Sequence, residues 1–439
     1  MQCIPLRGIN GLYIMRRNLK LFSALLALCV GMGPMTVFAE RGSEDSHSVV
    51  SGSGVTVEAN SARNAAQQNY SVNHGPYLQG LCYDGVIVVF TTSHKGFSKV
   101  EIRKRGQSEV RVCDSRKDGL IMANNTHNVI RIDGLEPATD YEYRIVSTKV
   151  EDFQPYKVTF GESISTPWYE FRTFDPKARE FNFVVLNDIH DDAKKCDKLL
   201  SMQPMDKANM VFYVGDIMSY FSSPDQPYTS FIDVSVNRFA KHKPFAVVRG
   251  NHETRGYLAR TYDQFIHNTR DGKYYGFYTF GSTAVVMLDC GEDKPDTHPV
   301  YAGFVAFDEY RLEQIEWLKG VLKSKEFRRA KNRIVLLHIP PAVEAMKQQD
   351  EKAVKDMLEW HGNVHWGQIL LPLLNKADID LMISAHQHSF HYFAPQKGVI
   401  EFPLVINDNH SAMYVSSNDD GISVKVTNQS GKELMNRKF

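Results

Sequence analysis

A set of side chains of metal-binding type follows short hydrophobic runs in the second half of the chain. Its members are Asp188, His190, Asp216, Asn251, His338, His386 and His388. Carboxylate oxygens, imidazole nitrogens and an amide oxygen are donors for Mn, Fe or Zn, and no cysteine belongs to the set. This combination predicts a centre for two divalent or transition metal ions with open coordination positions, rather than a closed structural zinc site.

The same residues indicate what such a centre does. Two divalent ions carry more positive charge than Asp188 and Asp216 neutralise, so the site attracts a phosphate group and acidifies a bound water. Asp216 can bridge two ions, and two ions can clamp the attacking and leaving oxygens of an in-line displacement. The residue types therefore predict hydrolysis of a phosphate ester by a metal-bridging hydroxide.

Each of these residues alone has a simpler explanation. A lone Asp after a strand is usually a turn former or helix cap, and a lone His is usually a surface or half-buried residue. Their joint position indicates a site, because ligands of open α/β sheets bind beyond the carboxyl ends of the strands. The strand-like segments that carry them are 181–190, 211–216, 245–252, 334–338 and 381–388.

The order of these blocks resembles the calcineurin-like metallophosphoesterase family. The blocks are Asp188-Ile189-His190, Gly215-Asp216, Gly250-Asn251-His252-Glu253, His338 and Ala385-His386-Gln387-His388. The resemblance implies one metal on Asp188, His190 and His388, and a second on Asn251, His338 and His386, with Asp216 as the bridge. It implies for His252 the role of general acid toward the leaving oxygen, or of transition-state stabiliser, and not of ligand.

Three further residues are candidates for contact with the substrate. Asn187 stands where the family usually has glycine, and its amide could donate a hydrogen bond to a phosphate. Arg255 and Tyr257 follow the third block closely and could contact the phosphate or the leaving group. The alternative for both is a solvated loop.

The elements that position these residues alternate between strand and helix from residue 177 onward. Helical spacing of apolar residues predicts helices near 192–202, 231–242, 312–322 and 366–376. Gly281 and Ser282 between two β-type runs predict a hairpin turn, and the tail after about residue 390 reads as short strands. Residues 177–439 are therefore expected to form an α/β domain, a two-sheet β-sandwich flanked by helices.

Residues 73–176 have a different character. Short β-type runs separated by Gly, Pro, Asn and Asp predict an all-β sandwich. Residues 135–143 resemble part of a fibronectin type III domain, which implies that Tyr141 closes a corner of the sandwich. A β-sandwich ahead of such an α/β domain also resembles purple acid phosphatases. Ser219, however, holds the place of the tyrosinate ligand of those enzymes, with Tyr220 one residue later, so a colourless protein is expected.

The N-terminus predicts export. Arg16, Arg17 and Lys20 precede the apolar run 21–30, and Ala39 ends a signal-peptidase pattern, which defines a signal peptide over 1–39. Residues 40–72 read as a flexible linker. An uncleaved anchor or a lipid on Cys29 are alternatives, and they are the only membrane contacts that the sequence suggests. The expected location is periplasmic, secreted or cell-surface.

Chain length, net charge and cysteine content bear on domain number, binding partners and disulfides. A chain of 439 residues suggests two domains, and equal counts of basic and acidic residues, 51 each, give no nucleic-acid-binding signal. Cys82 and Cys113 either form a disulfide, which an oxidising environment after export would permit, or are small buried hydrophobic residues.

The sequence thus predicts an exported two-metal phosphohydrolase of small phosphorylated mono- or diesters. Two alternatives remain: a surface binding or adhesion protein with a degenerate catalytic domain, and a metal-dependent hydrolase of a non-phosphorus ester. The natural substrate and the oligomeric state stay open.

Overall fold

The computed structural model of the protein describes residues 69–439. The predicted signal peptide, with Cys29, and all but the last residues of the predicted linker lie outside this range. Within it, no helix combines the length and the apolar character that crossing a bilayer requires.

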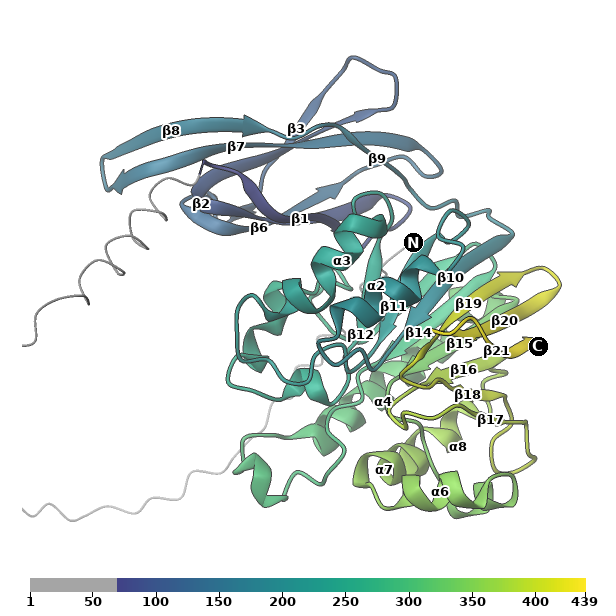
Figure 1. The fold of residues 1–439 in the computed structure, drawn as a ribbon. Coiled ribbons are helices and arrows are strands. Elements are labelled where there is room, and N and C mark those ends of the chain that lie inside the picture. The colour runs from purple at the N-terminus through teal and green to yellow at the C-terminus, as the bar shows by residue number, and fades with distance from the viewer. Residues whose placement is uncertain (1–68) are drawn as a thin grey trace, which may run out of the picture. The chain divides into compact units, whose positions relative to one another are not determined.

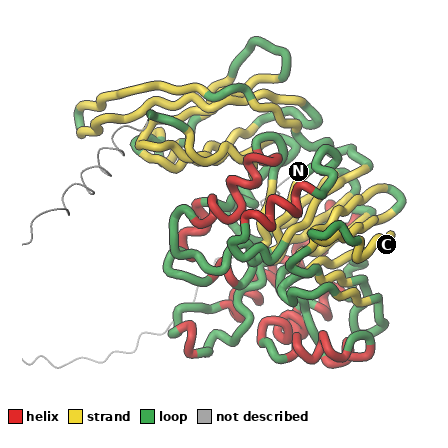
Figure 2. Tube along the Cα trace, viewed as in Figure 1, coloured by secondary structure: helices red, strands yellow, loops and turns green. Residues whose placement is uncertain are grey.

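The first part of the described chain consists of strands (Figures 1 and 2). They are β1 (Val72–Gln79), β2 (Gly85–Lys104), β3 (Arg111–Cys113), β4 (Arg116–Lys117), β5 (Leu120–Ile121), β6 (Asn125–Asp133), β7 (Asp140–Gln154), β8 (Lys157–Ser165) and β9 (Tyr169–Arg172). Alternate residues of β2, β6 and β7 share one apolar core. The region is β-rich, as predicted, while its fibronectin-like topology stays a prediction.

Strand β2 serves two sets of partners. Its first part pairs with β1 and β6, its second part pairs with β3 and β7, and the register shifts between Thr91 and Gly96. The sequence predicts two separate runs here, 86–91 and 99–103. One strand covers both because an irregularity of this kind lets a strand bend without ending.

Two mixed sheets follow. The first has the order β12-β11-β10-β19-β20-β21 and the second β13-β14-β15-β16-β18-β17. The bounds of the first are β10 (Glu180–Leu186), β11 (Met210–Val214), β12 (Phe245–Val248), β19 (Ser411–Asn418), β20 (Gly421–Asn428) and β21 (Glu433–Lys438). Those of the second are β13 (Gly276–Phe280), β14 (Thr283–Leu288), β15 (Asn332–Leu337), β16 (Leu381–Ser384), β17 (His391–Phe393) and β18 (Leu404–Ile406).

The two sheets share a core. On β10, Phe183 and Val185 belong to the apolar cluster that also contains side chains of β14, β15 and β16. Val184 and Leu186, one residue out of phase, belong to the cluster that contains α2. Both faces of the strand are buried, so its sequence is a continuous apolar run rather than an alternating one.

Helices cover the outer faces of the sheets, as Figure 2 shows. They are α2 (Ala193–Ser201), α3 (Asp233–Ser235), α4 (Phe307–Lys323), α5 (Lys325–Arg329), α6 (Glu351–Leu358), α7 (His361–Ile369) and α8 (Leu371–Leu374). The helices predicted near 192–202 and 312–322 and the hairpin at 281–282 are present. The prediction near 231–242 corresponds to α3 between two π-helical turns.

The predicted helix 366–376 is wrong as a single element. Helix α7 ends at Ile369 and α8 begins at Leu371. Pro372 has no backbone N–H, and its ring clashes with the carbonyl four residues earlier in a continuous helix.

The β-rich region contacts the sheets that follow. Tyr77 of β1 is fully buried in the cluster of α2, its ring lies 5.6 Å from that of Phe245, and its hydroxyl donates to the Phe265 carbonyl at 3.1 Å. Within residues 69–439 no disulfide is present, because Cys82, Cys113, Cys196 and Cys290 are all free thiols. The Cys82–Cys113 alternative is thus not realised.

Replacing Tyr141 by Phe tests the corner of the β-rich region. The Tyr141 hydroxyl accepts a hydrogen bond from the Glu136 N–H at 2.8 Å, so Tyr141→Phe should lower the free energy of unfolding by about 1 kcal/mol. Urea unfolding measures it, with fully exposed Tyr156→Phe as the control. An equal loss in both variants, or none in either, would contradict the assignment.

Candidate metal centre

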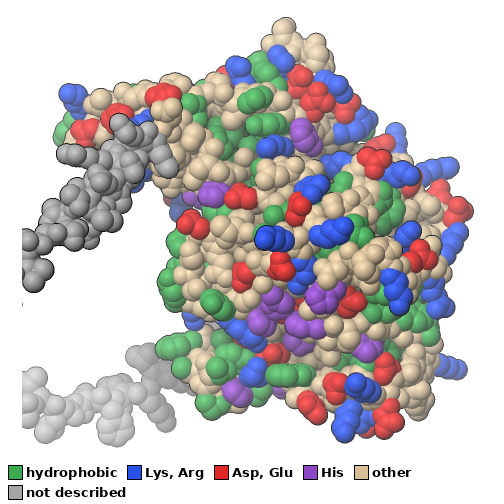
Figure 3. All heavy atoms as spheres, viewed as in Figure 1, with side chains coloured by type: hydrophobic (Ala, Val, Ile, Leu, Met, Phe, Trp, Pro, Cys, Tyr) green, Lys and Arg blue, Asp and Glu red, His purple; other side chains and the backbone are tan. Residues whose placement is uncertain are grey.

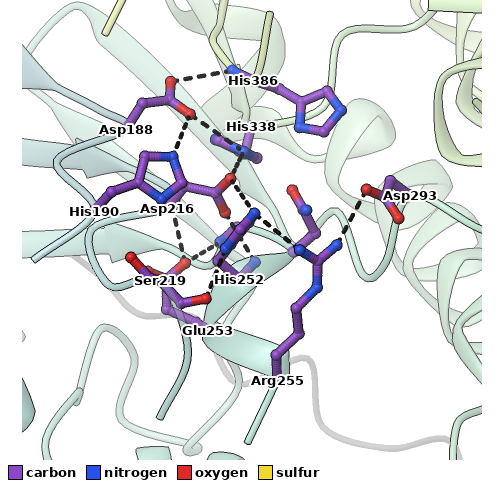
Figure 4. Close-up of polar contacts among 12 residues, drawn as sticks. Asp188, His190, Asp216, Ser219, His252, Glu253, Arg255, Asp293, His338 and His386 are labelled. Carbon is purple, nitrogen blue, oxygen red and sulfur yellow. Dashed lines mark hydrogen bonds and ion pairs between the residues drawn. The ribbon is translucent and has the colours of Figure 1, made fainter. Parts of the chain in front are cut away.

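The predicted site residues lie just beyond the ends of parallel strands. Asp188 and His190 follow β10, Asp216 follows β11, Asn251 and His252 follow β12, His338 follows β15, and His386 and His388 follow β16. Figure 4 shows side chains from both sheets turned toward one another. Figure 3 shows histidines gathered on one face of the protein. The structure therefore brings the predicted set together.

The backbone is held in an unusual conformation at these strand ends. Left-handed φ angles occur at Asp188 (48°), His190 (50°), Asp216 (53°), His386 (70°) and His388 (52°). Each such residue carries a steric cost that glycine would avoid, so the surrounding fold must impose it.

Glycine is required where the backbone passes close to the site. A Cβ at Gly215 would lie 2.3 Å from Nδ1 of His338, and a Cβ at Gly250 would lie 2.3 Å from Oδ1 of Asp216. These two positions explain the glycines of the second and third blocks.

The donor atoms fall into two adjacent groups. Asp188, His190 and His388 form one, Asp216, His338 and His386 form the other, and within each group the donor atoms lie within 4.8 Å of one another. In the first group Nε2 of His388 is 3.3 Å from Oδ1 of Asp188. In the second, Nε2 of His338 is 3.1 Å from Oδ2 of Asp216, and it is 4.0 Å from Oδ1 of Asp188. Each group has the composition and spacing of a metal site.

Several buried polar atoms of the centre have no hydrogen-bond partner. They are Oδ1 of Asp188, Nε2 of His338, and both amide atoms of Asn251, whose residue is 1% exposed. Buried polar atoms are normally paired, because leaving one unpaired costs about 1–3 kcal/mol. Oδ1 of Asp188 and Nε2 of His338 lie 4.0 Å apart, and a cation between them would satisfy both, so these residues fit bound cations.

Hydrogen bonds to carbonyl groups orient two of the imidazoles. Nδ1 of His338 lies 2.8 Å from the Val214 carbonyl, and Nδ1 of His252 lies 2.7 Å from the Ser219 carbonyl. A carbonyl only accepts, so Nδ1 carries the proton in both rings. Nε2 is then the ring atom that faces the centre in both histidines, as a ligand or a proton-transfer group requires.

Buried charge makes the centre attractive to cations. Burial alone raises the pKa of the Asp188 carboxyl, but the imidazoles of His190, His338 and His388 outweigh it and hold that pKa well below its usual value. For His338, burial opposes protonation, but Asp216 and Asp188 raise its pKa to about 10. Both carboxylates are thus ionised, and positive charge beside them is stabilised.

Asn187 supports the centre and does not face the substrate. It is fully buried, and its Nδ2 donates to Oδ2 of Asp188 at 2.8 Å and to the Asp408 carbonyl at 3.0 Å. Its Oδ1 accepts from Asn407 at 2.7 Å. Both ends of the amide are thus engaged within the protein, which leaves no free N–H for the phosphate contact that the sequence predicts.

Glu253 holds the loop that carries Asp216. Its fully buried carboxylate accepts from the backbone N–H groups of Asp216, Ile217, Met218 and Gly250 at 2.7–3.0 Å. Burial and the charge of Asp216 raise the pKa of Glu253 to about 7. Glu253, the acidic residue of the third block, therefore positions the backbone around Asp216 in the second block.

Arg255 reaches the centre, with its guanidinium clamped by acids. Glu292 accepts from its Nε and Nη2 at 2.9 Å each, and Asp293 accepts at 3.1 Å. Its Nη1 donates to Nε2 of His252 at 2.9 Å (Figure 4). Tyr257, in contrast, is 74% exposed.

Three residues around the centre were not predicted from the sequence. Glu292 and Asp293 follow β14 after a short loop, and Asn407 directly follows β18. The strand-end rule that located the histidines would have located them too, had it been applied to every strand.

Comparisons with known proteins agree with this geometry. A family model described as calcineurin-like phosphoesterase matches residues 181–390. No curated protein matches the chain. Among solved structures, the purple acid phosphatase PPD1 from yellow lupin (Lupinus luteus) seeds is similar in fold, at 13% identity, with a TM-score of 0.59, over 82% of this chain and 73% of that one.

More distant matches include a predicted phosphoesterase of Streptococcus pneumoniae TIGR4, at 12% identity and a TM-score of 0.27, over 60% of this chain and 98% of that one. A cold-active protein-tyrosine phosphatase of a psychrophilic Shewanella species matches at 11% identity and a TM-score of 0.27, over 84% of this chain and 99% of that one.

Taken with the donor groups, the family match shows that residues 181–390 are a calcineurin-like phosphoesterase domain and that the protein is a metal-dependent phosphoester hydrolase.

Proposed function

We propose that the protein is an exported hydrolase of small phosphate mono- or diesters that uses two divalent ions. The observation that carries the proposal is the adjacency of two donor groups, each with one carboxylate and two imidazoles. Asp188, His190 and His388 would hold one ion, Asn251, His338 and His386 would hold the other, and Asp216 would be shared between them. When bound, the ions polarise the phosphoryl group and supply a nucleophilic water at neutral pH.

His252 is the group placed to move a proton. Its Nε2 faces the centre, 3.8 Å from Oδ2 of Asp216, while its Nδ1–H is fixed on the Ser219 carbonyl. Burial lowers the pKa of His252, and Arg255 occupies its Nε2 lone pair as a donor. A leaving-group oxygen that displaces Arg255 from Nε2 meets an imidazole already oriented for proton transfer.

Arg255 supplies a fixed positive charge beside His252. Its clamp by Glu292 and Asp293 prevents the guanidinium from swinging away, so a phosphate oxygen or leaving oxygen meets a preorganised donor. Tyr257 remains a candidate for contact with the rest of the substrate. Support for export comes from the N-terminal pattern of the sequence, with its basic, apolar and small-residue segments.

Turnover of a chromogenic phosphate monoester and of the matching diester tests the proposal. Chelation should abolish activity, Mn, Zn or Fe should restore it, and Asp216→Asn should lower it by more than about 100-fold, since loss of outer-shell partners alone costs 10–100-fold. Asp233→Asn is the control, because Asp233 pairs with His74 and belongs to neither donor group.

Two results would contradict the proposal. One is metal-independent turnover, and the other is full activity in Asp216→Asn. Hydrolysis of carboxylic esters without phosphate esters would favour the non-phosphorus alternative.

Asn187→Ala tests the support of the first donor group. Without the amide, Asp188 loses its orienting donor, and metal affinity should fall by about 10–100-fold in a chelator competition assay. Asn128→Ala removes another buried asparagine, which lies in β6, and should leave affinity unchanged. Unaltered affinity in Asn187→Ala would assign Asn187 to packing alone.

The iron-loaded protein should be colourless. Ser219 occupies the position of the tyrosinate ligand, and Tyr220 is 54% exposed. Without a phenolate on iron, no charge-transfer band arises, and a visible spectrum of the iron-reconstituted protein checks this. A band that disappears in Tyr220→Phe would overturn the prediction.

A further inference from the structure

A third group of donors lies outside the centre described above. Asp308 stands in the first turn of α4, and His361 and His365 stand on α7. Residues four apart on a helix share one face, so both imidazoles point the same way. Among residues 69–439, this is the one place apart from the centre where three such donor atoms come within 4.8 Å of one another.

The distances suit a single ion. Nε2 of His361 is 2.8 Å from Oδ1 of Asp308, and Nδ1 of His365 is 2.9 Å from the same oxygen. An ion about 2.1 Å from each donor requires them to be about 3.0 Å apart in octahedral and about 3.4 Å apart in tetrahedral geometry. The two distances to Oδ1 of Asp308 therefore need to lengthen by only a few tenths of an ångström, and the two imidazole nitrogens lie within 4.8 Å of each other.

A competing explanation is a pair of hydrogen bonds. Each imidazole can donate one N–H to Asp308 without any metal. Other histidines of the protein do this singly: His74 with Asp233 at 3.0 Å, and His391 with Asp350 at 2.9 Å. The Asp308 group differs, because two imidazoles converge on one carboxylate at helical spacing, which a hydrogen bond alone does not require.

Arg311 contacts the same carboxylate oxygen as the two imidazoles, and its Nη1 lies 3.5 Å from Nδ1 of His365. Its fully buried guanidinium donates to Oδ1 of Asp308 at 2.7 Å and to the carbonyls of Cys290 and Glu292. Such an outer partner orients a ligand, but its positive charge weakens the attraction of Asp308 for a cation. Binding must then depend mainly on the imidazoles, which favours zinc over magnesium or calcium.

We propose that Asp308, His361 and His365 bind one zinc ion at a site separate from the phosphoesterase centre. All three side chains are partly exposed, so water can complete the coordination. The ion would tie the start of α4 to the start of α7. Both flank the segment that carries Glu292 and Asp293, since Gly362 N–H donates to the Asp293 carbonyl at 2.8 Å. The site thus stabilises the acids that clamp Arg255.

Zinc stoichiometry of the full chain tests this site. Metal-free protein is titrated with zinc and dialysed, and bound metal is measured by elemental analysis. His361→Ala/His365→Ala should bind one equivalent less than the unsubstituted chain. His74→Ala, which removes a histidine paired with one carboxylate, should bind the same amount as the unsubstituted chain.

A second background separates this site from the phosphoesterase centre. With Asp188→Asn and Asp216→Asn in place, one equivalent of zinc should remain, and the added histidine substitutions should remove it. Cobalt in that background should show the visible bands of a nitrogen- and oxygen-ligated ion, which His361→Gln abolishes.

Three outcomes would overturn the proposal. They are equal stoichiometry with and without the two histidines, no zinc in the Asn background, and zinc there that survives loss of both histidines. The Asp188→Asn, Asp216→Asn background retains the sequences of α4 and α7. Its zinc content therefore tests the site even if the histidine variant fails to fold. Failure of the proposed phosphoesterase chemistry would leave this stoichiometry unaffected.

Discussion

Two ionised carboxylates buried side by side impose the main constraint on this structure. Asp188 and Asp216 are withdrawn from water, and such charges are tolerated only when compensating charge or hydrogen bonds surround them. The histidines from both sheets supply part of that compensation, and the pKa of about 10 at His338 shows how strongly the site favours positive charge. Three features bring this charge to one place. They are the left-handed backbone conformation at the strand ends, the glycines next to these residues, and the imidazoles that hydrogen bonds to carbonyl groups orient.

The strand ends could be predicted from sequence because the signal is local. A buried apolar run followed by a polar residue is visible in the chain itself, and parallel strands bring their carboxyl ends to one edge. Asp216 and His338 were predicted in this way to belong to one site. They follow strands of different sheets, and their donor atoms lie 3.1 Å apart. The alternation of sheets and covering helices was accessible for the same reason.

What could not be predicted depends on contacts distant in sequence. Asn187 was expected to face a phosphate, but residues more than 200 positions later engage its amide. The sequence around Arg255 was compatible with a solvated loop. The structure shows instead that Glu292 and Asp293 form ion pairs with it. The break between α7 and α8 could have been predicted locally, because Pro372 lies in the interior of the predicted helix and a proline there argues against a continuous helix.

The connection from Asn187 to Asn407 and Asp408 affects the order in which the protein matures. Strand β10 and its first metal-binding carboxylate are made early, but the groups that orient that carboxylate lie beyond residue 390, where the family match ends. A chain emerging from a ribosome therefore carries Asp188 before the residues that orient its side chain have been made. The hydrogen bonds that orient Asp188 are therefore complete only when the segment after β18 is in place, so the centre depends on more of the chain than residues 181–390.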